Sequence, residues 1–171
     1  MKIIALEGID NAGKTTICKK IEEVFKDRDD LVVSYELSSE IGKSHKKDLS
    51  LMDAKEKTLL FATDRIFREK EYKKYKVVVC DRYIYSAFVY REMEGCDIEW
   101  VKSVNSIFDE PYLNIYCDVD LDEAFKRGGY IPYTRDELKI CKDIYSRYID
   151  DKKMINYKGF EWLVSKIKRL L

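Results

Sequence analysis

The stretch Gly8-Ile9-Asp10-Asn11-Ala12-Gly13-Lys14-Thr15 decides the fold of this chain. It fits the pattern G-x-x-x-x-G-K-[ST], in which glycines let backbone N–H groups turn toward a bound phosphate. An apolar run at 2–6 precedes it, as in a buried parallel strand, and helical apolar spacing follows it at 16–26. A tight turn in an ordinary strand–helix unit would explain the two glycines but not the Lys-Thr pair after them. We therefore predict a phosphate-binding loop.

The loop predicts a nucleotide-binding site with Mg²⁺ as a further ligand. The Lys14 ammonium can reach the β- and γ-phosphates, and the Thr15 hydroxyl can bind the metal ion. The helix that starts at the end of the loop adds unpaired N–H donors and a dipole that favours an anion. The predicted nucleotide-binding residues are Gly8, Ile9, Asp10, Asn11, Ala12, Gly13, Lys14, Thr15 and Thr16.

Strands alternate with helices along the rest of the chain. Apolar runs predict strands at 31–35, 76–80, 111–117 and 154–157, and helical spacing predicts helices at 53–74, 83–93, 98–108, 122–127, 134–150 and 160–171. We interpret 36–47 as a polar loop and 128–133 as a flexible stretch. This order predicts one α/β domain over 1–171, with a five-stranded parallel sheet covered by helices on both faces. Ligands of such sheets bind at the carboxyl ends of the strands.

The charge balance and the cysteines exclude some classes of protein. Lys plus Arg and Asp plus Glu number 32 each, so nothing indicates general binding to nucleic acid or to a membrane surface. The five cysteines form no C-x-x-C pair, and there is one histidine, so a metal centre of those ligands is disfavoured and a reducing compartment is indicated. Because no segment resembles a signal peptide or a membrane span, we expect a cytoplasmic protein.

Five segments in order resemble those of the thymidylate kinases, a family of nucleoside monophosphate kinases. They lie at 7–16, 38–43, 59–65, 81–90 and 111–127 and match the family's loop, the segment after strand two, and its L-L-F-x-x-x-R, D-R-Y-x-x-S-x-x-x-Y and P-D-L-x-x-x-L-D-V…R patterns. A GTPase switch is disfavoured because neither N-K-x-D nor D-x-x-G occurs in a suitable place. The resemblance implies a three-layer P-loop kinase fold with a short lid at about 127–136, phosphoryl transfer from ATP to dTMP, and a homodimer.

The resemblance implies that Asp10, Phe61 and Arg65 bind the acceptor nucleotide. Asp10 would hold the 3′-hydroxyl of its sugar or act near the metal ion, Phe61 would stack on thymine, and Arg65 would donate a hydrogen bond to a base carbonyl. Phe61 and Arg65 are four residues apart and share a helix face. Taken alone, Asp10 also fits an ordinary turn residue and Phe61 a core residue. Arg65 alone would fit a surface partner of Glu69 or Asp64.

Asp81 and Arg82 end an apolar strand beside the loop. Asp81 can organise Mg²⁺ or its water, and Arg82 can bind the acceptor phosphate through a bidentate fork. The pair also fits a helix N-cap and a surface arginine. Ala87 and Tyr90 share a helix face after them, and by resemblance Tyr90 packs beside the sugar and disfavours a 2′-hydroxyl. A core aromatic stripe is the alternative for Tyr83 on that face.

Arg127, Arg135 and the glycines between them resemble a short lid. Gly128 and Gly129 fit hinges, and either arginine could act on the transferring phosphoryl group, although Arg127 could instead complement the C-terminus of its helix. A closed lid would exclude water from the reaction. The predicted catalytic residues are Asp10, Lys14, Asp81, Arg82, Arg127 and Arg135.

Two positions depart from the family pattern. Asn11 stands where some members carry a basic residue, so the lid must supply that charge. The stretch 33–37 has no basic residue, although an arginine is usual there in the family, and we predict Lys43 or Arg68 as its replacement. Two alternatives therefore stay open. One is a related kinase with another nucleoside monophosphate or a deoxynucleoside as acceptor, and the other is a nucleotide-binding regulatory protein with weakened catalysis.

Overall fold

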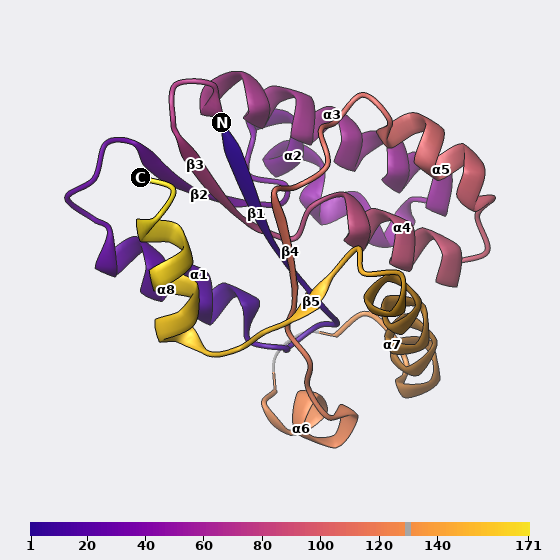
Figure 1. Ribbon diagram of the computed structural model, residues 1–171. Helices are drawn as coiled ribbons and strands as arrows, with labels where there is room; N and C mark the ends of the chain where they lie inside the picture. The colour runs from indigo at the N-terminus through magenta and orange to yellow at the C-terminus, as the bar shows by residue number, and fades with distance from the viewer. Residues whose placement is uncertain (129–130) are drawn as a thin grey trace.

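The computed structural model describes residues 1–128 and 131–171, and a five-stranded parallel sheet forms its centre (Figure 1). The strand order is β2-β3-β1-β4-β5, and each neighbouring pair runs parallel. The strands are β1 (Lys2–Glu7), β2 (Leu31–Tyr35), β3 (Val77–Asp81), β4 (Leu113–Tyr116) and β5 (Ile155–Asn156). The predicted α/β fold with five parallel strands is confirmed.

The two central strands are apolar because both of their faces are covered. Every residue of β3 is buried, and β1 is buried from its second residue onward. Ile3 lies opposite Val78 and Ile4 opposite Val79 across the shared ladder. Runs of β-branched residues are typical of parallel strands that are buried on both faces.

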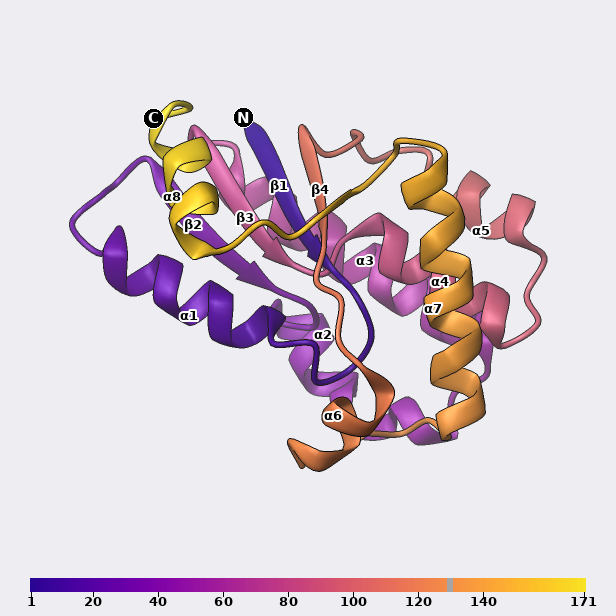
Figure 2. The same ribbon diagram turned by 60° about the horizontal axis from the view of Figure 1, so that its bottom comes forward.

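Helices lie on both faces of the sheet, as predicted (Figures 1 and 2). One face carries α1 (Lys14–Val24) and α8 (Phe160–Lys168). The other face carries α3 (Ala54–Tyr72), α4 (Ile84–Met93), α5 (Ile98–Asn105) and α7 (Arg135–Asp150).

The carboxyl ends of the strands meet at one edge, where the predicted site lies (Figure 2). The loop 8–13 follows β1, and Arg82 follows β3. After β2 the chain forms α2 (Glu40–His45) and a 3₁₀ helix, η1 (Lys46–Leu51), and after β4 it forms α6 (Leu121–Lys126). Segments far apart in the sequence therefore surround the phosphate loop.

The segment 36–47 differs from the predicted polar loop because it carries α2 and the start of η1. Ser39 caps α2 by accepting a hydrogen bond from Gly42 N. The buried Asp64 carboxylate on α3 accepts hydrogen bonds from Leu37 N (2.9 Å) and Ser39 N (3.0 Å). A side chain at Gly42 would collide with Asp64, so the two segments pack closely. These contacts join residues distant in sequence, and local patterns do not reveal them.

The other predicted elements occur with shifts of a few residues at their ends. Asp53 sets the start of α3 through a capping box with Glu56, as its carboxylate accepts hydrogen bonds from the backbone of the first turn. Two residues of the predicted flexible stretch, Gly129 and Tyr130, lie outside the described residues. All five cysteines are free thiols. Within 1–128 and 131–171, we find no helix with the length and apolar character that a membrane span needs.

Candidate active site

Two glycines shape the loop at the end of β1. Gly8 has a φ of +139°, and a Cβ there would lie 2.5 Å from the carbonyl oxygen of Cys117. Gly13 has a φ of +86° and stands at the N-cap of α1. Glycine adopts such conformations without a steric penalty. The backbone of the loop therefore curls over the N-terminus of α1, which is the arrangement that binds phosphate.

Lys14 is buried within this loop. Its Nζ donates hydrogen bonds to the carbonyl oxygens of Gly8 (3.0 Å) and Ile9 (2.6 Å). Burial lowers the pKa of Lys14 to about 8, and the nearby Arg82 guanidinium adds to the shift. The ammonium group is thus fixed beside the backbone donors that a phosphate chain would contact.

Thr15 and Asp81 meet at the end of the loop. The Thr15 hydroxyl donates to Asp81 Oδ2 at 2.5 Å. Mg²⁺ takes such hydroxyl and carboxylate oxygens and usually completes its shell with waters and phosphate oxygens. Among the described residues, no cluster of three or more His, Cys, Asp or Glu side chains is suited to a metal. The Thr15 hydroxyl and the Asp81 carboxylate are oxygen donors of the kind that Mg²⁺ accepts.

Asp10 joins the loop to the segment after β3. Its carboxylate accepts hydrogen bonds from Arg82 Nη2 (2.8 Å) and from the Tyr90 hydroxyl (2.9 Å). Arg82 also donates to the Gly8 carbonyl oxygen (2.8 Å), and its guanidinium lies 5.0 Å from the centre of the Tyr90 ring. Arg82 has a φ of +70°, a strained value of the kind that clusters at functional sites. Three predicted residues from two distant segments, 7–16 and 81–90, thus form one cluster.

Glu7 supports this cluster from the protein interior, and the sequence analysis did not select it. Its carboxylate is buried and accepts hydrogen bonds from Tyr83 N (2.9 Å) and the Ser86 hydroxyl. Burial raises the pKa of Glu7 to about 7, while the Ser86 hydrogen bond opposes the shift. The sequence signal for Glu7 is its place directly before the loop.

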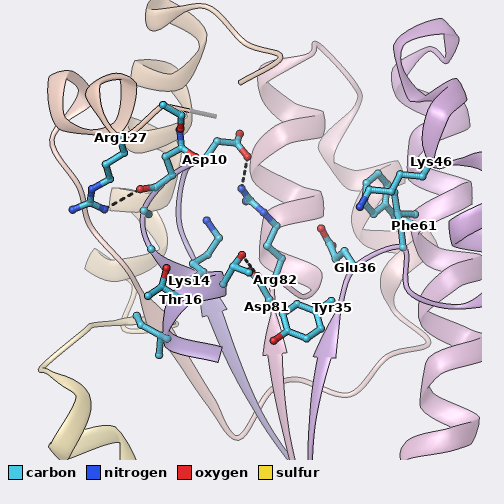
Figure 3. A pocket seen from close by; sticks show the side chains of 17 residues that line it. Asp10, Lys14, Thr16, Tyr35, Glu36, Lys46, Phe61, Asp81, Arg82 and Arg127 are labelled. Atoms are coloured by element: carbon cyan, nitrogen blue, oxygen red, sulfur yellow. Dashed lines mark hydrogen bonds and ion pairs between the residues drawn. The ribbon is translucent and has the colours of Figure 1, made fainter. Parts of the chain in front are cut away.

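A cavity of about 960 Å³ opens over the loop (Figure 3). Residues 10–16 line it, together with Asp81, Arg82 and Arg127. Figure 3 shows Arg127 on one side of this cavity and Phe61 on the other. Residues 10–16 of the predicted nucleotide-binding loop therefore face this cavity. The other two predicted loop residues, Gly8 and Ile9, are buried.

A second cavity, of about 560 Å³, extends from the first toward α3 and α4. Its lining adds the predicted residues Ala87 and Tyr90, along with Tyr133, which the sequence analysis did not assign to the site. The Tyr90 and Tyr133 rings lie 5.2 Å apart. The two cavities share Asp10, Glu36, Lys46, Phe61 and Arg82. A phosphate-binding space and an aromatic space thus meet at Asp10 and Arg82.

The structure places Arg65 differently from its predicted position beside Phe61. Its side chain is 1% exposed and is absent from the lining that the described residues give either cavity. Arg65 Nη1 donates to Asn105 Oδ1 at 2.7 Å, and Nη2 lies 3.5 Å from Glu36. In this structure Arg65 therefore reaches the site through Glu36, which itself lines both cavities.

The predicted replacements for the missing arginine also point elsewhere. Arg68 is buried, with its Nε 2.7 Å from Asp64 and its Nη1 bonded to Ser34. Lys43 is exposed on α2 and is not part of either cavity lining in the described chain. Lys46 on η1 lines both cavities, and its neighbour Lys47 lines the second, so these lysines of the region face the site.

The two predicted lid arginines differ in position. Arg127 lines the first cavity, and its Nη1 donates to the backbone carbonyl of Asn11 at 2.9 Å. Arg135 is exposed at the start of α7, pairs with Asp122, and does not contribute to either described cavity lining. Gly129, one of the predicted hinges, lies outside the described residues. Of the two arginines, the geometry therefore brings Arg127 to the loop.

Sequence comparisons relate the chain to one family. Residues 6–151 match the profile described as thymidylate kinase. A probable thymidylate kinase of Sulfurisphaera tokodaii is 37% identical over an alignment that covers 99% of this chain and 91% of that protein. One from Methanocaldococcus jannaschii is 38% identical, with 89% of this chain and 84% of that protein covered. One from Methanococcus aeolicus is 36% identical, and the match spans 75% of this chain and 66% of that protein.

Two solved structures share the fold. A thymidylate kinase from Candida albicans superposes with a TM-score of 0.71 at 18% identity, covering 98% of this chain and 89% of that one. A thymidylate kinase from Ehrlichia chaffeensis gives a TM-score of 0.72 at 21% identity, with 97% of each chain covered. At these identities the likeness concerns the path of the chain, namely the parallel sheet and its two helical layers.

Proposed function

The chain belongs to the thymidylate kinase family, and from this premise we propose that it transfers the terminal phosphoryl group of ATP to dTMP, giving ADP and dTDP. The family makes it a nucleoside monophosphate kinase, a phosphotransferase. The observation that supports this substrate pair is the junction of the two cavities at Asp10 and Arg82. Nucleotides bound in the two spaces would bring their phosphate groups together at this junction.

The donor nucleotide belongs over the loop. Backbone N–H groups of the loop and the N-terminus of α1 bind its phosphates, and Lys14 adds a positive charge beside them. Thr15 and Asp81 would hold Mg²⁺, which neutralises charge on the phosphate chain when it is bound. Both side chains face the first cavity together with Lys14.

The acceptor belongs in the second cavity. The Phe61 ring supplies a surface on which a pyrimidine can stack, and stacking on aromatic rings is a common way to hold a base. Asp10, Ala87 and Tyr90 line the part of this cavity that we assign to the sugar, where the Tyr90 ring would disfavour a 2′-hydroxyl. Arg82 binds the acceptor phosphate, because its planar guanidinium matches the two oxygens of a phosphate.

Transfer then needs positioning and charge neutralisation. A phosphate oxygen of dTMP attacks the γ-phosphorus of ATP in line, and the bond to the β–γ bridging oxygen breaks. ADP leaves with the electron pair of that bond, so no covalent enzyme intermediate forms. Lys14, Arg82 and Arg127 face the place where charge develops and would stabilise it.

We also propose a homodimer formed through α3. Leu59, Ile66 and Phe67 are exposed on the side of this helix that faces away from Phe61. A row of exposed apolar side chains on one helix indicates a contact surface. Light scattering should give the mass of a dimer for the wild type and of a monomer for Phe67→Glu, and a monomeric wild type would overturn this proposal.

We place the reaction in the cytoplasm, with ATP and dTMP as the partners of the protein. Both are soluble nucleotides of that compartment. The five free thiols agree with a reducing environment.

The direct test is ADP formation from MgATP with dTMP, dUMP, dCMP, dAMP, dGMP and UMP in parallel, beside a control without acceptor. We expect strong turnover with dTMP. Turnover that is stronger with another monophosphate would overturn the dTMP assignment and keep a related kinase. ATP binding without turnover on any acceptor would favour a regulatory nucleotide-binding protein.

A further inference from the structure

The proposed nucleotide site gives no role to the side chain of Asn11, a residue of the phosphate loop. Its backbone has a φ of +57°, in the left-handed region that asparagine tolerates better than most residues. A glycine would adopt this conformation more easily, so the conformation alone does not call for an asparagine.

The Asn11 side chain reaches the end of α6. Its Nδ2 donates hydrogen bonds to the carbonyl oxygens of Ala124 (3.0 Å) and Gly128 (2.8 Å). The last carbonyls of a helix have no N–H partner within the helix. Gly128 N bonds to Phe125 O, and the Asn11 amide supplies a donor to the Ala124 carbonyl. Asn11 therefore caps a helix that lies more than a hundred residues later in the chain.

Arg127 makes a second contact between the end of α6 and the loop. Its Nη1 donates to the Asn11 carbonyl oxygen at 2.9 Å, and its Nε lies 3.2 Å from Glu123. Figure 3 shows the Arg127 side chain on the wall of the first cavity. Loop and helix are thus joined in both directions, and the place of the guanidinium depends on where the helix end docks.

We propose that Asn11 is a positioning residue that docks the end of α6 on the phosphate loop and thereby sets Arg127 for the donor nucleotide. This inference rests on the proposed use of the loop as the ATP site. The C-terminal carbonyls of a helix repel an anion, and the Asn11 amide covers one of them, that of Ala124, and the Gly128 carbonyl just beyond the helix. Because Asn11 lines the first cavity and is absent from the described lining of the second, acceptor binding is independent of its side chain.

The test compares Asn11→Gly with Asn156→Gly. Asn11→Gly keeps the backbone conformation and removes both amide hydrogen bonds, while Asn156 is an exposed asparagine on β5. The Kd for MgATP, measured by calorimetric titration, should rise about tenfold in Asn11→Gly, which corresponds to about 1.4 kcal/mol. The KM for dTMP should stay within about twofold of the wild-type value, and Asn156→Gly should leave both values unchanged.

A double-mutant cycle with Arg127→Ala tests the route of the effect. If Asn11 acts through Arg127, Asn11→Gly should add little to the loss of ATP binding in the Arg127→Ala background. Fully additive losses, an unchanged Kd for MgATP in Asn11→Gly, or an equal rise in the KM for dTMP would each overturn the inference. Thermal unfolding of each variant verifies that it is folded. The ATP titration needs no turnover, so it still decides this inference if the proposed kinase reaction fails.

Discussion

The two cavities of the site are built in opposite ways. The first cavity, which we propose for the donor, takes its phosphate-binding part from one continuous stretch, in which the backbone at Gly8 and Gly13 sets the shape and Lys14 supplies the charge. The acceptor cavity is assembled from side chains of η1, α3 and α4 that only the fold brings together. A short motif can therefore specify the phosphate-binding part of the first cavity, whereas tertiary packing specifies the second cavity. Substitutions should therefore separate the two.

Lys14→Ala should give the largest effect. The substitution removes the buried ammonium group beside the donor phosphates, and we expect kcat with dTMP to fall about 10³-fold, as for the loss of one preorganised charge-stabilising group. Lys19→Ala, at an exposed position on the same helix, should keep wild-type kcat. A loss below about tenfold in a steady-state ADP assay would show that the loop does not carry the donor chemistry.

Arg82→Lys should give the next largest effect, because Arg82 stands where the two cavities meet. Lysine keeps the charge but loses the planar fork that bonds Asp10 and Gly8 together. We expect kcat/KM for dTMP to fall about 10²-fold, with the KM for ATP changing much less. Arg28→Lys, at an exposed pair with Asp30, is the matched control. Equal changes in the KM values of both nucleotides would place Arg82 with the donor instead.

The phosphate loop could be predicted from the sequence because its residues are neighbours in the chain. The loop motif fixes which groups turn inward, and residues 10–16 indeed line one cavity. The fold class followed from the alternation of strands and helices, since a parallel sheet requires the crossovers that helices supply. The ends of the elements were less certain, because capping and packing set them.

The acceptor side could be predicted only in part. The spacing of Phe61 and Arg65 places both on one helix face, but Asn105 from α5 draws the Arg65 guanidinium into the interior. Nothing local in 36–47 reveals that Asp64 holds this segment, or that Lys46 then faces the cavities. Such orientations depend on partners far along the chain, which a local pattern does not contain.

Glu7 connects the two sides, and its pKa predicts how stability depends on pH. Its folded pKa of about 7 is above the ordinary value, so the folded state keeps a proton that the unfolded state releases. The stability that this proton contributes is present at low pH and is lost as the pH rises through 7. Relative to Glu7→Gln, the wild type should lose about 2 to 3 kcal/mol of unfolding free energy between pH 5 and pH 8.

Urea denaturation at pH steps measures this difference. Glu99→Gln, which changes an exposed carboxylate to an amide, is the matched control. A difference between the wild type and Glu7→Gln that stays constant from pH 5 to pH 8 would show that Glu7 ionises in the folded protein as it does in water.

Phe61→Ala should give the smallest effect and the sharpest separation of the two cavities. Phe61 lines both cavities. If the loop backbone holds the donor, the Phe61 ring stacks only on the base that is bound in the second cavity. Base stacking on an aromatic ring contributes about 1 to 3 kcal/mol, so the KM for dTMP should rise by about one order of magnitude. Tyr112→Ala removes an exposed aromatic ring remote from both cavities and should change neither KM. If Phe61→Ala raises the KM for ATP as much as that for dTMP, the two cavities act as one site, and the division between a motif-built donor side and a packing-built acceptor side fails.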